Sequence, residues 1–211
     1  MTVQQSSPDS NANRYYNQGV RAAAMEYRLV IQPSGEVCRN WSEESEYARN
    51  YYGTKEFRFS RPEIVVARFE AKEEMEELLL KWFRNVICQT ASFPVLLNNY
   101  GSMPGFPLFV RVQDSTPFRP LMYGLKMLSG VLEDNGCTGI RFFQSMRLPI
   151  ADHINKSTEL EILLDYSGRS FRAEMEVNEV LLIKNDSGAN SDKTVSRLKL
   201  LPAENTKLFA V

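Results

Sequence analysis

Ser60-Arg61-Pro62-Glu63-Ile64-Val65-Val66-Ala67-Arg68-Phe69-Glu70 is the stretch that decides the predicted fold. Its run of β-branched residues lies between a proline and a charged segment at residues 70–72, a pattern typical of a β-strand. Side chains alternate between the two faces of a strand. The alternation predicts one face with Glu63, Val65 and Ala67, and the opposite face with Ile64, Val66 and Arg68.

A shorter stretch in the second half of the chain has a similar form, Met146-Arg147-Leu148-Pro149-Ile150-Ala151. Arg147 takes the position that Glu63 has in the first stretch, and Pro149 takes the position of Val65. The sequence therefore predicts two related strands, one in each half of the chain.

The two stretches resemble the strand motifs of the 2H phosphoesterase superfamily, the RNA 2′,3′-cyclic phosphodiesterases and 2′-5′ RNA ligase-like proteins. In that family a Pro-His-hydrophobic-Thr/Ser-hydrophobic-Ala-Arg pattern occurs twice. The first stretch matches the pattern at Pro62, Ile64, Val66, Ala67 and Arg68. Glu63 and Arg147 stand where the family has histidine, and Val65 and Pro149 stand where it has threonine or serine.

The resemblance implies a mechanism with two histidines as acid and base, and with two hydroxyls that bind the phosphoryl oxygens in the transition state. This chain has one histidine in total, His153. The standard two-histidine chemistry is therefore excluded by composition. We assign no catalytic residue, no cofactor and no metal site, and we expect a catalytically degenerate relative.

The resemblance covers about residues 25–184 and implies an α+β fold. Two pseudo-symmetric lobes, each with an antiparallel sheet and outer helices, are expected around a central cleft. Residues 1–13 are rich in Ser, Gln, Asn and Asp and are expected to form a disordered tail. Residues 14–211 are then one bilobal domain.

The composition limits the partners and the compartment of the protein. Of 211 residues, 25 are basic and 26 acidic, so a net charge of −1 predicts no extended nucleic-acid footprint. The sequence has three cysteines and no CxxC spacing, so it indicates neither a disulfide framework nor a zinc site. This cysteine content favours a cytoplasmic protein. From the polar amino terminus we expect no signal peptide, and no apolar run reaches the ~18 residues of a membrane span.

Hydrophobic periodicity predicts the elements around the two motif strands. The predicted helices cover residues 37–51, 72–89, 118–132 and 155–166. The predicted strands cover residues 25–33, 62–70, 93–99, 107–112, 141–151, 171–184 and 194–201. Residues 99–106 and 185–192, rich in Gly, Pro, Asn and Ser, are predicted loops.

Glu63 and Arg147 are the first candidates for a ligand site. If both occupy histidine positions, they face each other across the cleft and form a charge-assisted pair. Such a pair is expected to lower the pKa of Glu63. One interpretation is that the pair only fills an inactive site. Another is that Arg147 binds a phosphate or carboxylate while Glu63 acts as a base or binds a ribose hydroxyl.

Three further residues are weaker ligand-binding candidates. His153 follows the second motif closely, and Tyr100 and Tyr123 are candidates to stack on a base. A basic rim for the cleft is available from Arg58, Arg61, Arg68, Arg119 and Arg141.

Three hypotheses for the function remain open. The preferred one is a degenerate 2H-like protein that binds a nucleotide, an RNA end or another anionic ligand in its cleft. The second is an enzyme with altered chemistry on a phosphodiester or nucleotide that uses Glu63 and Arg147. The third is a structural module that binds a protein partner and whose cleft is plugged by side chains.

Overall fold

The computed structural model describes residues 24–53, 58–154, 156–186 and 191–203. The expected tail at residues 1–13 lies outside these ranges. In the described ranges the strands form two five-stranded antiparallel sheets. Sheet A has the order β10-β9-β1-β3-β6, with the bounds Met25–Ile31 (β1), Ile64–Ala71 (β3), Thr138–Phe142 (β6), Glu179–Asp186 (β9) and Ser191–Lys199 (β10).

Sheet B takes the remaining strands of the described chain in the order β2-β7-β5-β4-β8. Its strands have the bounds Arg58–Phe59 (β2), Phe93–Met103 (β4), Phe106–Val112 (β5), Arg147–His153 (β7) and Arg172–Val177 (β8). The two motif strands are thus in different sheets, β3 in sheet A and β7 in sheet B. This is the arrangement that two similar lobes require.

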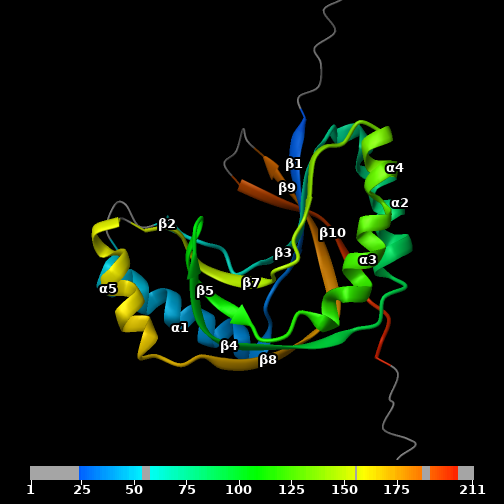
Figure 1. Cartoon of the computed structure of the whole chain (residues 1–211). Coiled ribbons are helices and arrows are strands. Elements are labelled where there is room, and N and C mark those ends of the chain that lie inside the picture. The colour runs from blue at the N-terminus through cyan, green and yellow to red at the C-terminus, as the bar shows by residue number, and fades with distance from the viewer. Residues whose placement is uncertain (1–23, 54–57, 155, 187–190, 204–211) are drawn as a thin grey trace, which may run out of the picture.

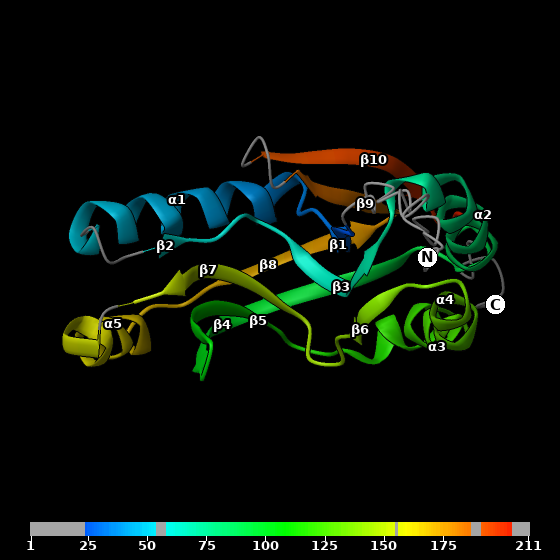
Figure 2. The ribbon, with the colours of Figure 1, turned by 90° about the horizontal axis from the view of Figure 1, so that it is seen from above.

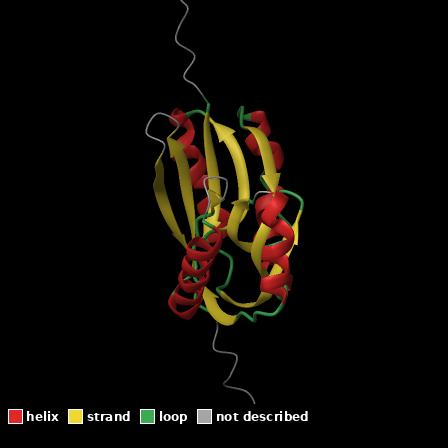
Figure 3. Cartoon of the chain, turned by 90° about the vertical axis from the view of Figure 1, so that its left-hand side faces the viewer, coloured by secondary structure: helices red, strands yellow, loops and turns green. Residues whose placement is uncertain are grey.

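The helices divide into two groups, one against each sheet (Figure 1). Helices α1 and α5 pack on sheet B, and α2, α3 and α4 pack on sheet A. Their bounds are Gly35–Tyr52 (α1), Glu76–Ile87 (α2), Arg119–Met127 (α3), Ser129–Asp134 (α4) and Lys156–Ser167 (α5), with 3-10 turns at Glu73–Met75 and Thr116–Phe118. Figure 3, seen from the side of α1 and α5, shows these two helices in front of the strands.

The periodicity of the helices explains how they pack. Helix α1 buries Val37, Trp41 and Ala48, as its three-to-four spacing predicts, and it ends at Gly53. Helix α2 buries Leu79, Phe83 and Ile87. The ammonium of the buried Lys184 on β9 contacts two carboxylates near the start of α2. They belong to Glu73, which begins the 3-10 turn, and to Glu76, which begins the helix.

The predicted α+β fold with two antiparallel sheets and outer helices is confirmed. The prediction was wrong at the points where the chain passes from one sheet to the other. Residues 141–151 are not one strand, because β6 ends at Phe142 in sheet A and β7 begins at Arg147 in sheet B. Residues 171–184 likewise divide at Asn178 between β8 in sheet B and β9 in sheet A.

Two other predicted boundaries were also wrong. The loop predicted at residues 99–106 is a tight hairpin, because β4 continues to Met103 and the turn needs only Pro104 and Gly105, the latter with φ of 81°. The helix predicted at residues 118–132 is interrupted at Leu128, and a separate helix follows from Ser129.

Strand β3 carries a β-bulge that changes which side chains share a face. Val65 pairs with Val30 and Ala67 pairs with Leu29, so Val66 is an extra residue on β3. The alternation shifts by one at this point, and Ala67 is fully buried. The strict alternation predicted from the sequence was therefore wrong beyond Val65.

Candidate functional site

The two motif strands approach each other between the sheets, β3 from sheet A and β7 from sheet B (Figure 2). A small cavity of about 50 Å³, the central cavity, lies between them. The residues that line it come from both motifs, from the connection before β7 and from the start of β5: Glu63, Val65, Arg68, Phe106, Phe143, Ser145, Arg147 and Pro149. The four motif positions identified in the sequence, Glu63, Val65, Arg147 and Pro149, thus meet in one place.

A larger open groove of about 450 Å³ adjoins the central cavity. The two share Glu63, Val65, Arg68, Phe106 and Pro149. Small-molecule sites are typically about 300 to 1,000 Å³, so the groove has the size of a ligand site, whereas the central cavity has room for little more than a water molecule. The outer lining of the groove is strongly charged and includes Glu26, Arg28, Arg58, Arg61, Asp152 and Asp192.

Arg68 lines both the central cavity and the groove. The alternation of the strand predicted that Arg68 points away from Glu63 and Val65. The bulge at Val66 reverses this direction, since two successive residues, Val66 and Ala67, are both buried in the core. Arg68 also contacts Glu26 on β1, at 3.6 Å between Nε and Oε1.

Glu63 is buried, with 5% of its surface exposed. Its carboxylate pairs with Arg28 on the neighbouring strand β1, at 3.3 Å between Oε2 and Nη1. Arg28 in turn contacts the carboxylate of Asp192 on β10, and Arg61 contacts the same Asp192 oxygen. Four charged side chains, Arg28, Arg61, Glu63 and Asp192, thus form one network along the groove.

Burial is the largest influence on the ionisation of Glu63, and it raises the pKa of the carboxyl. Arg28 lowers the pKa of Glu63, Asp192 raises it, and Arg61 lowers it, each by less than the burial does. The expectation that an arginine partner leaves the pKa of Glu63 below its ordinary value was therefore wrong. The free-energy cost of removing the carboxylate from water is larger than the stabilisation that Arg28 and Arg61 give to its charged form.

Arg147 stacks on aromatic rings instead of pairing with Glu63. Its guanidinium carbon lies 4.0 Å from the ring centre of Phe106 and 5.5 Å from that of Phe109. The guanidinium also contacts the sulfur of Met103, and burial lowers the pKa of Arg147. Among the described residues no carboxylate lies within ion-pair distance of Arg147, so the expected pair with Glu63 is not formed.

Several contacts hold the second motif strand in place. The indole N–H of Trp41 on α1 donates to the carbonyl oxygen of Pro149 at 2.8 Å. The hydroxyl of Ser60 donates to Asp152 at 2.5 Å, and the backbone N–H of Ser60 donates to Ile150. Helix α1 and the segment before β3 therefore fix the backbone that presents Arg147 and Pro149.

Hydroxyl groups do lie near the cleft, but not at the motif positions. Ser145 lines the central cavity two residues before Arg147, and Ser60 lines the groove. Ser60 is engaged with Asp152. Val65 and Pro149, at the positions where the family has hydroxyls, present apolar surface to both spaces.

His153 does not line the central cavity or the groove. It is exposed at the end of β7, where it pairs in register with Arg58 on β2. The only histidine of the sequence is thus at the rim of sheet B. The structure does not bring it together with Glu63 and Arg147.

Tyr100 also lies away from the central cavity and the groove. Its ring packs edge-on against Tyr166 and Phe171, with centroids 4.7 and 6.0 Å away. Burial, and then the nearby carboxylate of Glu44, raises the pKa of Tyr100. The side chain belongs to the packing between sheet B and its helices, so the expectation that it stacks on a ligand in the cleft was wrong.

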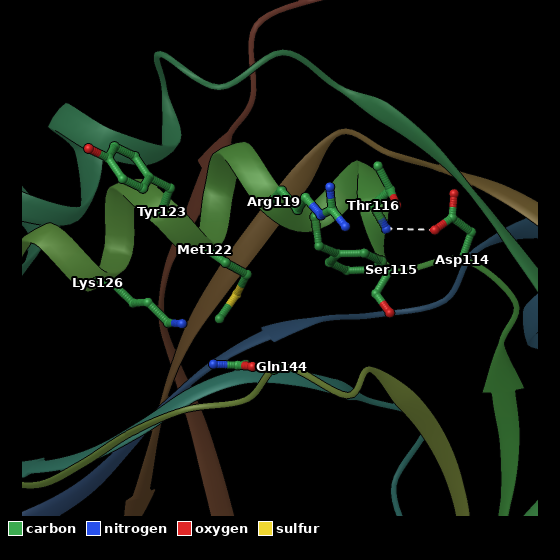
Figure 4. A pocket seen from close by; sticks show the side chains of 9 residues that line it. Asp114, Ser115, Thr116, Arg119, Met122, Tyr123, Lys126 and Gln144 are labelled. Atoms are coloured by element: carbon green, nitrogen blue, oxygen red, sulfur yellow. Dashed lines mark hydrogen bonds between the residues drawn. The ribbon is translucent and has the colours of Figure 1, made fainter.

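Tyr123 lies on a different surface, in a groove of about 550 Å³ along α3 (Figure 4). Its ring is 70% exposed. Arg119 and Lys126 lie on the same helix, and Gln144 faces them from the connection between β6 and β7. Tyr123 and Arg119 therefore line a separate surface groove and not the groove beside Glu63.

The predicted basic rim is formed only in part. Arg58, Arg61 and Arg68 line the groove. Arg141 is on β6, in register with Arg68 of the adjacent strand, and lines neither the groove nor the central cavity. Within the described ranges, no cluster of three or more His, Cys, Asp or Glu side chains is placed to hold a metal ion.

The sequence interpretation missed Arg28 and Asp192. Arg28 had a signal, because it is a charged residue directly before the apolar run Leu29 to Ile31 of the same strand, and a buried charge needs a partner. Asp192 had none, because it lies 164 positions further along the chain in a segment that was predicted to be a loop.

None of the helices in the described part of the chain combines the length and apolar character of a membrane span.

No protein-family model and no curated protein matches the sequence. Solved structures do match the fold. The structure of TT0787 from Thermus thermophilus has a TM-score of 0.62 at 15% identity, over 85% of this chain and 100% of that chain. A phosphoesterase structure has a TM-score of 0.59 at 16% identity, over 85% and 99% of the two chains.

Escherichia coli LigT in complex with 3′-AMP also matches, with a TM-score of 0.59 at 13% identity, over 85% of this chain and 99% of that chain. Further structures of the same protein contain NADP⁺, ATP or phosphate. The matches extend over almost the full length of each solved chain. With two antiparallel sheets, outer helices and the two motif strands meeting at one cavity, this chain has the 2H phosphoesterase fold.

Proposed function

We propose that the protein binds an anionic ligand, a nucleotide or an RNA end, in the groove beside Glu63, and that it does not carry out two-histidine phosphoesterase chemistry. The observation that carries the proposal is the convergence of Glu63 and Arg147 on one cavity, which shares five lining residues with a groove of about 450 Å³. Structures of Escherichia coli LigT, which has the same fold, contain 3′-AMP, NADP⁺, ATP or phosphate, and these ligands support the proposal.

Arg147 is the cation that we assign to the ligand's anionic group. Its guanidinium has no carboxylate partner among the described residues, unlike those of Arg28, Arg61 and Arg68. A guanidinium stacked on an aromatic face still has in-plane N–H donors for a phosphate. The stack on Phe106 also fixes its position before a ligand arrives, which lowers the entropy lost on binding.

The side chains at the motif positions explain why we propose binding without two-histidine catalysis. In the described part of the chain, no histidine lines the central cavity or the groove, so the acid and base that the resemblance implies are absent from it. Val65 and Pro149 cannot donate a hydrogen bond from their side chains to a phosphoryl oxygen. Transition-state stabilisation at those positions is therefore lost, while an electrostatic contact from Arg147 remains.

The proposal is tested by isothermal titration of the protein with 3′-AMP and with ATP, with the variants Arg147→Met and Arg147→Lys. Removing a charge-assisted contact worth about 1.5 to 3 kcal/mol weakens binding by roughly tenfold to a hundredfold. Arg147→Lys restores only part of the affinity, because lysine lacks the planar guanidinium.

Arg172→Met is the matched control, because Arg172 is an exposed arginine on the outer strand β8 of the same sheet. It is expected to leave the affinity unchanged. Equal affinities of the native protein and Arg147→Met contradict the role of Arg147. No binding of either nucleotide contradicts the proposal and favours the third hypothesis, a protein-interaction module whose cleft is filled by its own side chains.

A second candidate, an enzyme with altered chemistry, is favoured by one observation. Burial raises the pKa of Glu63, which brings the carboxyl closer to the range of a general acid or base at neutral pH. Hydrolysis of a phosphodiester or nucleotide that survives in His153→Ala and disappears in Glu63→Gln supports this candidate. We prefer the binding function because four of four chemical positions in the two motifs are replaced.

A further inference from the structure

We propose that Arg28 and Arg61 form a phosphate-binding subsite of the groove, and that the carboxylate of Asp192 occupies this subsite as an internal competitor of the ligand. The inference rests on the proposed function, since it names a second contact for the same anionic ligand. Neither arginine belongs to the motifs, and Asp192 lies far from both in the sequence.

The geometry of Asp192 is the first support. Arg28 reaches it from β1 and Arg61 reaches it from the segment before β3, and both guanidinium groups contact the same oxygen, Oδ2. Two guanidinium groups that converge on one anionic oxygen form the arrangement by which arginines recognise phosphate. All three side chains line the groove of about 450 Å³, so a ligand in the groove has access to the same donors.

The donors of Arg28 are the second support. Arg28 is largely buried, with 15% of its side chain exposed, and it directs Nη1 to Glu63 and Nη2 to Asp192. Its Nε is buried without a hydrogen-bond partner among the described residues. A buried donor without an acceptor costs free energy, and a phosphate with three terminal oxygens offers acceptors that a single carboxylate oxygen does not.

Asp192 is placed so that it can leave the subsite by rotation of its side chain. It is the second residue of β10, which is the outer strand of sheet A. In the described part of the chain, its side chain has ion pairs with Arg28 and Arg61 alone. While the carboxylate occupies the subsite, the apparent affinity for an anion is reduced by the fraction of molecules in which the subsite is blocked.

The test is the titration of the full chain with inorganic phosphate and with 3′-AMP, in the native protein and in Asp192→Asn. Asparagine has nearly the same shape as aspartate but no charge, and Arg28 keeps Glu63 as a partner. We expect Asp192→Asn to bind both anions about tenfold more tightly or better, since the competitor is removed. Thermal unfolding of the variant verifies that it is folded, and Asp192→Ser repeats the test if it is not.

Glu179→Gln is the matched control for the loss of a negative charge that is paired with an arginine. Glu179 on β9 contacts Arg197, at 2.6 Å between Oε1 and Nη1, but lines neither the groove nor the central cavity. Removing a charge outside the groove is expected to change the affinity by about twofold or less. A gain in Asp192→Asn no larger than that in Glu179→Gln overturns the inference.

The double variant Asp192→Asn, Arg61→Gln distinguishes two explanations of tighter binding, a specific contact of the anion with Arg61 and a general change in the electrostatic potential of the groove. Arg61 is half exposed, so its replacement leaves the core unchanged. We expect the double variant to lose most of the gain of Asp192→Asn. A gain that survives without Arg61 overturns the subsite.

The results distinguish failure of the subsite from failure of the proposed function. If Arg147→Met weakens binding but Asp192→Asn has no effect, the subsite fails and the proposed function stands. If the Asp192 and Arg61 variants behave as expected and Arg147→Met has no effect, the subsite stands and the role of Arg147 fails. If neither the native protein nor Asp192→Asn binds phosphate or 3′-AMP, both are overturned.

Discussion

The carboxylate of Glu63, directly before β3, pairs with Arg28 on the adjacent strand β1 of sheet A and not with Arg147 of sheet B. The ion pair therefore lies within one lobe and does not connect the two. Arg28 stands between two carboxylates, those of Glu63 and Asp192, and its own side chain is 15% exposed. This leaves Arg147, which lines the central cavity from β7, available for a different partner.

The first prediction is that Arg28 and Glu63 are energetically coupled. Arg28→Ala leaves the buried carboxylate of Glu63 without its nearest cation, so we expect the free energy of unfolding to fall by about 3 kcal/mol or more. Glu63→Ala costs less, because Arg28 keeps Asp192 as a partner. Urea unfolding of the two single variants and the double variant is expected to give a coupling of about 0.5 to 3 kcal/mol.

The same measurement with Arg147→Ala and Glu63→Ala provides the comparison. Since no ion pair joins these two residues, their effects are expected to add within about 0.5 kcal/mol. A larger coupling between Glu63 and Arg147 than between Glu63 and Arg28 would show that the charge network is organised across the cleft.

The second prediction concerns pH. Burial raises the pKa of Glu63 in the folded protein, so the folded state holds its proton at pH values where the unfolded state has released it. The contribution of Glu63 to the free energy of unfolding therefore falls as the pH rises from the ordinary pKa of glutamate to the folded-state value, and is constant above it.

Glu63→Gln lacks this titration. The difference in the free energy of unfolding between the native protein and Glu63→Gln is thus expected to decrease with rising pH through this window. The measurement is urea unfolding at several pH values. A difference that increases with pH would mean that Arg28 outweighs burial and that the pKa of Glu63 is lowered.

The third prediction is that the protein does not hydrolyse RNA 2′,3′-cyclic phosphates and does not ligate RNA. Both reactions need an acid and a base in the cleft, and His153 is exposed at the end of β7. Hydrolysis of a 2′,3′-cyclic nucleotide is followed by chromatography, with His153→Ala as the control for a contaminating activity. Turnover that His153→Ala abolishes would refute the prediction.

The fourth prediction tests the contact between α2 and α3. A Cβ atom at Gly124 would lie 2.5 Å from Cγ1 of Val86, so Gly124→Ala forces the helices apart. Overpacking costs about 1 to 3 kcal/mol, whereas replacing glycine by alanine inside a helix gains about 1 kcal/mol. We expect a net loss of stability in the native background, measured by thermal unfolding.

The sign of this effect reverses when the obstructing methyl group is removed. In the Val86→Ala background, only the helix-propensity gain of Gly124→Ala remains, so the substitution is expected to stabilise the protein. Destabilisation by Gly124→Ala in both backgrounds would show that the contact with Val86 is not the cause.

The elements that the sequence predicted well are those whose periodicity continues without interruption. Helix α1 has apolar residues at helical spacing and a glycine at its end, and both features are local. The crossings between the sheets are not signalled in this way. Asn178 is the single residue between β8 and β9, and the connection at residues 143–146 contains no glycine or proline.

The candidate site was predicted at its backbone positions but not in its contacts. The motif resemblance placed Glu63 and Arg147 at one cavity, because the two motifs determine where the backbone of these residues lies. Their partners are residues distant in the sequence, Arg28 for Glu63 and Phe106 for Arg147. The bulge at Val66 also depends on the register with β1, which the sequence of β3 alone does not specify.

The repeated passage of the chain between the two sheets has a kinetic consequence. Sheet A needs β1 from the beginning of the described chain and β9 and β10 from its end, and β1 pairs directly with β9. Neither lobe is a continuous segment, and sheet A is not complete until residues about 150 positions apart have met. Such non-local pairing slows folding. In a chain still emerging from the ribosome, β1 remains without its neighbour β9 until residues 179–186 have been synthesised.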